Sequence, residues 1–181
     1  MDVISIVNVE SVDRCIRKLK LGKACGPDGL SCEHLVNAHP LLVIHLCSLF
    51  TGVILHGFVP DAFGFGIIVP SMKDKTGDAN SLKNYRGITL IPVISKLFEI
   101  LLLEYFETVL LTDDIQFGFK NDLGCSNAIF TLSETIEYFR NRGSTVYAAT
   151  LNISKAFDCV NHYKLFTSWS KLAYLNGLLP S

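Results

Sequence analysis

Apolar residues recur at helical spacing in the first third of the chain. The apolar positions are Val9, Val12, Ile16 and Leu19, followed by Leu42, Leu46, Leu49, Phe50 and Val53. The first set predicts a helix ended by Gly22, because glycine readily stops a helix. The second set predicts a buried amphipathic helix ended by Gly57.

The same periodicity returns later in the chain. The apolar positions are Val93, Leu97, Ile100, Leu101 and Leu103, followed by Ile129, Leu132, Ile136 and Phe139. We expect a helix opened by Pro92 and running towards Leu110, and a second helix stopped by Gly143. A last helix is predicted from about Asn161 to Leu175.

Short apolar and β-branched runs lie between the predicted helices. Residues 67–69 predict a short buried strand closed by Pro70, and residues 88–91 predict a second strand. A polar loop over residues 71–84 separates these two strands. Residues 145–153 predict a third strand. With no internal repeat and no linker, the pattern indicates a helix-rich mixed α/β (α+β) domain.

Composition narrows the class of protein. The 181 residues are 49% hydrophobic, which excludes disorder of the whole chain and allows a sizeable core. A mean hydropathy of +0.36 suggests that part of the surface is covered by another segment or partner. The net charge of −1 gives no global positive field, so any binding of nucleic acid requires a local basic patch.

Residues 41–59 are apolar enough to cross a bilayer nominally, but they include histidines and lack a flanking basic cluster. We therefore expect no membrane association.

The six cysteines form no C-x-x-C pair, and the N-terminus lacks the pattern of a signal peptide. Cys25, Cys32 and His34 do not match a usual zinc spacing. Free thiols in an intracellular compartment, cytoplasm or nucleus, are expected.

Five motif blocks follow one another along the chain. They are GKACGPDGL (residues 22–30), IVP with KDKTGD (68–70 and 73–78), NYRGITL with SKLFE (84–90 and 95–99), QFGF with CSNA (116–119 and 125–128), and LNISKAFD with VNH (151–158 and 160–162). In this order the blocks resemble those of non-LTR (LINE-type) retrotransposon reverse transcriptases. The resemblance covers about residues 20–166.

The resemblance implies the fingers and upper palm of a right-hand polymerase, so that residues 1–181 form a partial reverse transcriptase domain without a thumb. It implies an inherited RNA-directed DNA polymerase activity that copies an RNA or DNA template-primer with dNTPs. In this family Mg²⁺ ions held by three aspartates support the reaction.

The resemblance also assigns candidate nucleotide-binding residues. Lys73 and Arg86 match finger residues that neutralise the triphosphate of the incoming nucleotide, and Phe157 matches a steric gate beneath its sugar. From the residues alone, Lys73 and Arg86 read as a solvated basic loop, and Phe157 reads as a core phenylalanine.

Gln116, Phe117 and Gly118 resemble the segment that lies against the template strand. Gly118 would permit close approach of the backbone. From the residues alone, Phe117 and Phe119 are ordinary core positions.

The catalytic position departs from the family. Asn152 stands where the first metal-ligating aspartate is expected, and the 181 residues contain no Tyr-x-Asp-Asp hairpin, which carries the other two. Asp113 and Asp114 follow a predicted helix and read as a turn, and Asp158 reads as a cap or turn residue. We therefore expect no intact metal site and a truncated, inactive reverse transcriptase fragment, a pseudoenzyme.

Two alternatives remain open at this stage. The chain could be a non-catalytic module that binds RNA or a protein through the retained finger surface, which carries lysines, Arg86 and interleaved aromatic residues. It could also be a fragment that does not fold stably, because its apolar surface is left uncovered.

Overall fold

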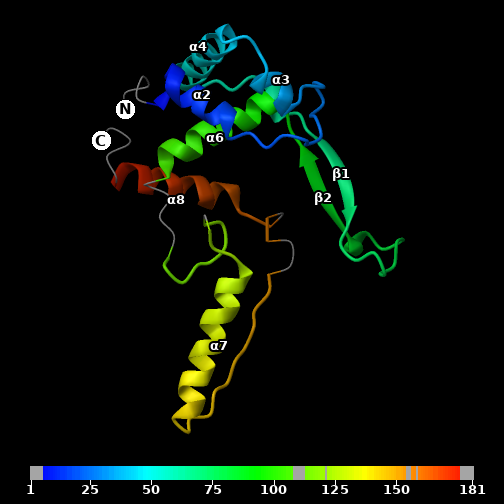
Figure 1. The fold of residues 1–181 in the computed structure, drawn as a ribbon, viewed down its shortest axis with the longest axis vertical. Helices are drawn as coiled ribbons and strands as arrows, with labels where there is room; N and C mark the ends of the chain where they lie inside the picture. Colours follow the sequence, from blue (N-terminus) through cyan, green and yellow to red (C-terminus); the bar gives the residue numbers. More distant parts are fainter. Residues whose placement is uncertain (1–5, 108–112, 121, 154–155, 158, 176–181) are drawn as a thin grey trace. The chain divides into compact units, whose positions relative to one another are not determined.

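The computed structural model describes residues 6–107, 113–120, 122–153, 156–157 and 159–175. The chain forms two compact units, residues 1–108 and residues 109–181. Helices predominate, and the described part contains one two-stranded antiparallel sheet (Figure 1). The mixed α+β class predicted from the sequence is therefore confirmed.

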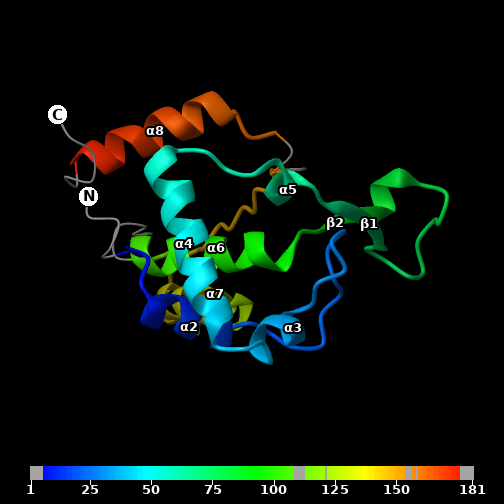
Figure 2. The same cartoon turned by 90° about the horizontal axis from the view of Figure 1, so that it is seen from above.

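The first unit is a small helical core with a hairpin attached to it. Its elements are α2 (Val9–Arg17), α3 (Cys32–Val36), α4 (Leu41–His56), α5 (Asp61–Gly64), β1 (Ile67–Met72), the short 3₁₀ helix η1 (Leu82–Asn84), β2 (Tyr85–Leu90) and α6 (Val93–Phe106). Helix α2 packs against α3, α4 and α6. Figure 2 shows α4 crossing α6, with the β1–β2 hairpin projecting away from the helices.

The core lies where α2, α4 and α6 meet. Its most deeply buried side chains are Val12, Cys15, Phe50, Leu97 and Leu101. The rings of Phe50 on α4 and Phe98 on α6 lie 5.1 Å apart between centroids, which ties these two helices together. The predicted apolar faces are confirmed except at their margins, since Val9, Leu49 and Leu103 are exposed. The predicted end of the first helix at Gly22 is wrong, because α2 ends at Arg17, whereas Gly57 ends α4 in the left-handed conformation with φ 61°.

The predicted burial of the first strand is wrong. Strand β1 continues through Pro70 to Met72, and Ile67, Ile68 and Val69 are 47%, 68% and 42% exposed. The reason is that, among the described elements, β1 packs closely only with β2, so its side chains are exposed on both faces of the ribbon. Pro70 is tolerated because an edge strand leaves one side of its backbone unpaired.

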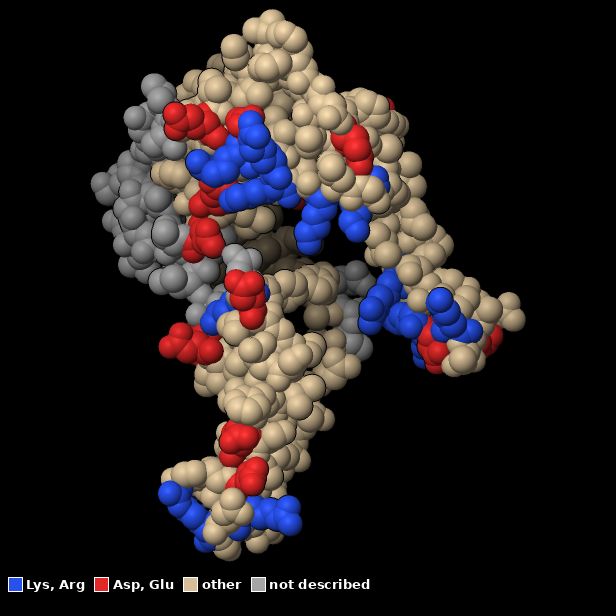
Figure 3. Space-filling model, in the orientation of Figure 1, with Lys and Arg blue, Asp and Glu red and all other residues tan. Residues whose placement is uncertain are grey.

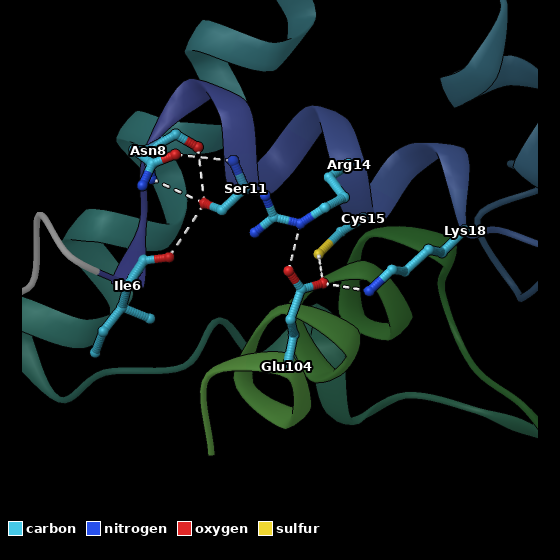
Figure 4. A network of polar contacts seen from close by, with 7 residues as sticks. All are labelled: Ile6, Asn8, Ser11, Arg14, Cys15, Lys18 and Glu104. Carbon is cyan, nitrogen blue, oxygen red and sulfur yellow. Dashed lines mark hydrogen bonds and ion pairs between the residues drawn. The ribbon is translucent and has the colours of Figure 1, made fainter. Parts of the chain in front are cut away.

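One carboxylate joins α6 to α2. Glu104 on α6 forms ion pairs with Arg14 and Lys18 on α2, the latter at 2.6 Å between Nζ and Oε2 (Figure 4). These hydrogen bonds, first from Lys18 and then from Arg14, lower the pKa of Glu104. The neighbouring Cys15 thiol is buried against Glu104, and this burial raises the pKa of Cys15 to about 11.

A glycine-rich loop runs between α2 and α3. The N–H of Gly29 donates to the carbonyl oxygen of Gly26 at 3.1 Å, and Gly29 has φ +69°, so residues 26–29 form a turn. Gly26 is buried against the junction of β2 and α6. A Cβ there would lie 2.6 Å from the carbonyl oxygen of Ile91 and 2.8 Å from the nitrogen of Pro92.

The second unit contains α7 (Cys125–Asn141) and α8 (His162–Leu175). Gly143 terminates α7 as predicted. The N–H of Gly143 donates to the carbonyl oxygen of Arg140, and the N–H of Ser144 donates to the carbonyl oxygen of Phe139, which is a Schellman motif. The strand predicted over residues 145–153 is wrong, because this described segment is extended but pairs with no strand.

The apolar stripe of α7 is not buried in the described structure. Ile129, Leu132 and Phe139 are 64%, 53% and 45% exposed. The helix itself was predicted correctly from its periodicity, but the partner that such a stripe normally packs against is not among the described residues of this unit. The predicted extension of α6 towards Leu110 lies outside the described residues.

No helix in the described part of the chain is long and apolar enough to cross a membrane. Residues 41–56 instead form α4, with Leu46, Phe50 and Val53 directed into the core. All six cysteines are free thiols, as the sequence predicted.

The contact at Gly26 makes a direct prediction. Gly26→Ala places a methyl group against backbone atoms that cannot move aside, so it should lower the free energy of unfolding by about 2 kcal/mol. Gly52→Ala is the matched control, because a Cβ at Gly52 in α4 meets nothing within 4 Å. We expect this control to be neutral or stabilising by up to about 1 kcal/mol. Urea unfolding followed by circular dichroism measures both, and equal stability of Gly26→Ala and the wild type would contradict the packing described.

The ion pairs of Glu104 predict a dependence of stability on pH. Because folding lowers the pKa of Glu104, its contribution is present above the ordinary glutamate value of 4.5 and is lost as the pH falls through the lower, folded value. Glu104→Gln should therefore be less stable by about 1 kcal/mol at neutral pH and equal to the wild type in acid.

Urea titrations across this pH range test the dependence. Glu99→Gln serves as the control, because Glu99 is an exposed residue of the same helix, and it should leave the pH profile unchanged. A deficit of Glu104→Gln that persists at low pH would contradict an electrostatic origin.

Candidate nucleic-acid interface

The tip of the β1–β2 hairpin is rich in cations. Residues 71–86 contain four cationic and two anionic side chains: Lys73, Lys75, Lys83 and Arg86, with Asp74 and Asp78. Figure 3 shows Lys and Arg gathered at this end of the first unit, with acidic side chains beside them. We call residues 71–86 the basic hairpin. It is the local basic patch that the overall charge of the chain does not provide.

Backbone pairing brings the two predicted nucleotide-binding residues to the same end of the ribbon. Ser71 pairs with Arg86, and the N–H of Lys73 donates to the carbonyl of Asn84 at 2.7 Å, which continues the pairing beyond the strand. Lys73 directly follows β1, and Arg86 lies in β2 close to its start. Both residues therefore lie at the same end of the ribbon, and both are exposed.

The cations of the basic hairpin are available for a ligand. The ion pairs among the described residues join Arg14 and Lys18 to Glu104 and Arg17 to Asp13, all outside the hairpin. The ammonium of Lys73 donates to the carbonyl of Lys83 at 2.9 Å, which uses one of its three protons and fixes its position.

Asn84 organises the loop that carries the lysines. Its amide side chain accepts from the N–H of Asp74 at 3.1 Å and donates to the carbonyl of Asp74 at 2.9 Å. Asp74 in turn accepts two hydrogen bonds from Thr76, and these lower the pKa of Asp74. Gly77 leaves room for this arrangement, since a Cβ there would lie 2.9 Å from the amide nitrogen of Asn84.

A pocket of about 370 Å³ opens at the foot of the hairpin. It is lined by the end of β2, the glycine-rich loop and the first turns of α6, and Lys23 and Lys96 both reach it. Glu99 also lines the pocket, so its charge is mixed.

The predicted template-contact residues belong to the second unit. Gln116 follows a turn in which its N–H donates to the carbonyl of Asp113 at 3.0 Å, and its side-chain amide donates to Gly118 at 3.3 Å. Phe117 is half-buried and lines a pocket at the start of α7, and a Cβ at Gly118 would meet open space. The turn predicted at Asp113 and Asp114 is confirmed, and Phe119 is 92% exposed, so its alternative role as a core residue is wrong.

Asn152 and Phe157 also lie in the second unit. Asn152 is exposed on the extended segment that follows α7. Phe157 is 77% exposed, which corrects its alternative reading as a core residue, and its ring lies 6.2 Å from that of Phe119 between centroids. Asp158 lies outside the described residues. The candidate residues thus divide between the units, Lys73 and Arg86 on the first and the others on the second.

Comparison of the sequence with known proteins shows which proteins the chain resembles. No family model matches the chain. The chain is 29% identical over 175 residues to the 115 kDa protein assigned to the type-1 retrotransposable element R1DM of Drosophila melanogaster. It is 26% identical over 186 residues to the RNA-directed DNA polymerase assigned to transposon BS of the same organism. The chain is thus similar to two retrotransposon proteins, one of them named as an RNA-directed DNA polymerase.

The relationship extends over most of the chain but over a small part of each relative. The two alignments cover 87% and 98% of this chain, and 17% and 20% of the relatives. These two alignments confirm the resemblance to retrotransposon reverse transcriptases that the order of the motifs predicts.

Reverse transcriptases as a family depend on divalent metal ions. The side chains of the described residues can therefore be compared with the ligands that such ions need. A two-metal site needs several carboxylates, because hard cations prefer anionic oxygen ligands. Asn152 offers a neutral amide oxygen, and the described residues hold no group of three or more His, Cys, Asp or Glu side chains placed as metal ligands. The described residues therefore do not fit a two-metal reverse transcriptase centre.

Sequence reasoning missed two features of the interface. It gave Asn84 no role, although an asparagine between polar loop residues commonly bonds to nearby backbone groups. It also did not single out Lys23, whose position beside Lys96 depends on the packing of Gly26. That packing is a contact distant in sequence, and no local pattern signals it.

Proposed function

We propose that the chain is part of a reverse transcriptase domain, comprising fingers and upper palm over about residues 20–166. Its role is to bind a single-stranded template with its primer and the phosphates of incoming dNTPs. The observation that carries the proposal is similarity to two retrotransposon proteins along 87% and 98% of the chain, where the motif blocks follow in family order.

The basic hairpin is the proposed phosphate-binding element. The guanidinium of Arg86 can donate to two phosphate oxygens at once, and Lys73 keeps two ammonium protons for the same purpose. Because these cations are exposed at the same end of the hairpin and form no ion pairs within the described residues, binding a polyanion does not require breaking existing salt bridges.

We further propose that this chain does not polymerise. The aspartate expected at position 152 would hold a metal and offset charge that develops on the transferred phosphoryl group. Asn152 carries no charge, and losing such an electrostatic contact typically costs several kcal/mol of transition-state stabilisation. The described residues do not supply another carboxylate cluster to replace it.

Primer extension tests the lack of catalysis. The purified chain, with an RNA template, a DNA primer, dNTPs and Mg²⁺ or Mn²⁺, should incorporate no nucleotide above the protein-free background. Asn152→Asp should not restore activity, because one added carboxylate does not complete the ligand set. Template-dependent incorporation by the wild-type chain would overturn this part of the proposal.

Salt-dependent RNA binding tests the basic hairpin. The wild-type chain should bind labelled single-stranded RNA more weakly as salt rises. Lys73→Ala with Arg86→Ala should weaken binding and reduce the slope of log K against log salt by about one to two. Arg17→Ala with Lys20→Ala removes the same charge from α2 and the residues after it, and should change binding little.

Fluorescence anisotropy over a salt series measures these affinities. Absence of RNA binding by the wild type at low salt would contradict the proposed function. Equal losses in the two double variants would show that net charge, and not the hairpin, determines binding.

A further inference from the structure

Phe119 combines two unusual features. Its φ is +62°, in the left-handed region that bulky residues rarely adopt, and its side chain is 92% exposed. A strained backbone is normally offset by burial of the side chain or by contacts that depend on it. Exposure of the Phe119 ring means that such compensation is not provided by packing within the described structure.

The neighbouring residues hold the Phe119 turn in place. The ammonium of Lys120 donates to the carbonyl of Asp113 at 2.6 Å, and the side-chain amide of Gln116 donates to the carbonyl of Gly118. These hydrogen bonds close residues 113–120 on themselves. The Phe119 ring is thereby directed outward from a turn that is held on both sides.

A second exposed ring meets Phe119. Phe157, from a segment distant in sequence, is 77% exposed, and the two ring planes are inclined at 87° in an edge-to-face pair. In this geometry the edge of one ring contacts the face of the other, so the remaining ring faces stay open. The pair presents flat apolar surface, and Lys120 directly follows Phe119 in the chain.

We propose that Phe119 and Phe157 form a stacking platform for an unpaired base of single-stranded nucleic acid. This inference rests on the proposed function, because the template is the single-stranded ligand that function requires. An open aromatic face binds any base by stacking, and a neighbouring ammonium suits the adjoining phosphate. Lys120 uses one of its three protons on Asp113 and retains two for this contact.

The platform accounts for the strain at Phe119. A residue kept in the left-handed region for ligand binding should be replaceable by one that adopts this conformation easily, with no loss of stability. Asparagine tolerates the left-handed region far better than phenylalanine does and lacks the ring. Phe119→Asn therefore separates a structural role from a role in binding.

The test measures stability and RNA binding on the same variants of the full chain. The probe is single-stranded RNA carrying 2-aminopurine, whose fluorescence falls when the base stacks, together with an abasic strand of the same length and charge. Phe119→Asn should melt at or above the wild-type temperature, bind the RNA at least about fivefold more weakly, and abolish the quenching. Phe119→Tyr should retain affinity and quenching, and the abasic strand should bind the wild type and Phe119→Asn equally.

Tyr147→Asn is the matched control, because Tyr147 is 93% exposed in the same unit and should not affect binding. If the wild type binds RNA and Phe119→Asn binds it equally well, the platform is refuted while the proposed function stands. If Phe119→Asn melts lower and keeps full affinity, the ring has a structural role only. If the wild type binds no RNA at low salt, both proposals fail.

Discussion

The contact between Gly26 and the backbone of Ile91 and Pro92 is the constraint on which the arrangement of the first unit depends. A Cβ at this site would lie 2.6 Å from the Ile91 oxygen, so only glycine lets the loop after α2 reach the junction of β2 and α6. That junction is where the hairpin becomes a core helix. The contact therefore sets both the direction in which the hairpin leaves the core and the pocket that Lys23 and Lys96 share.

Charge is distributed in the first unit so that its two ends differ. On α2, Arg14 and Lys18 are neutralised by Glu104, and this pairing joins α2 to α6. On the hairpin, Lys73 and Arg86 are held by backbone pairing and by Asn84, not by carboxylates. The cations that form ion pairs between α2 and α6 are thus separate from the cations of the hairpin, which form no ion pairs among the described residues. A chain with a net charge of −1 can in this way present a basic surface.

The sequence predicted the elements of this fold better than their environment. Helical periodicity placed α4 and α7 and their glycine ends correctly, because spacing and capping are local. The sequence pattern wrongly predicted that Ile68 is buried, because burial depends on how many strands and helices pack against a segment. For the candidate site, the family resemblance pointed to Lys73 and Arg86, and strand pairing brings them to the same end of the hairpin. The strain at Phe119 and its contact with Phe157 could not be read from the sequence, because both arise from backbone conformation and long-range contact.

The central claim is that this chain binds single-stranded nucleic acid through the basic hairpin and the aromatic pair. Photocrosslinking of 4-thiouridine RNA to the intact chain, followed by mass spectrometry of the peptides, tests it most directly. The account predicts crosslinks that concentrate in residues 71–86 and at Phe119 and Phe157, and that excess unlabelled RNA removes. Crosslinks confined to α2 and α4, or none above the level of an unrelated protein, would contradict it.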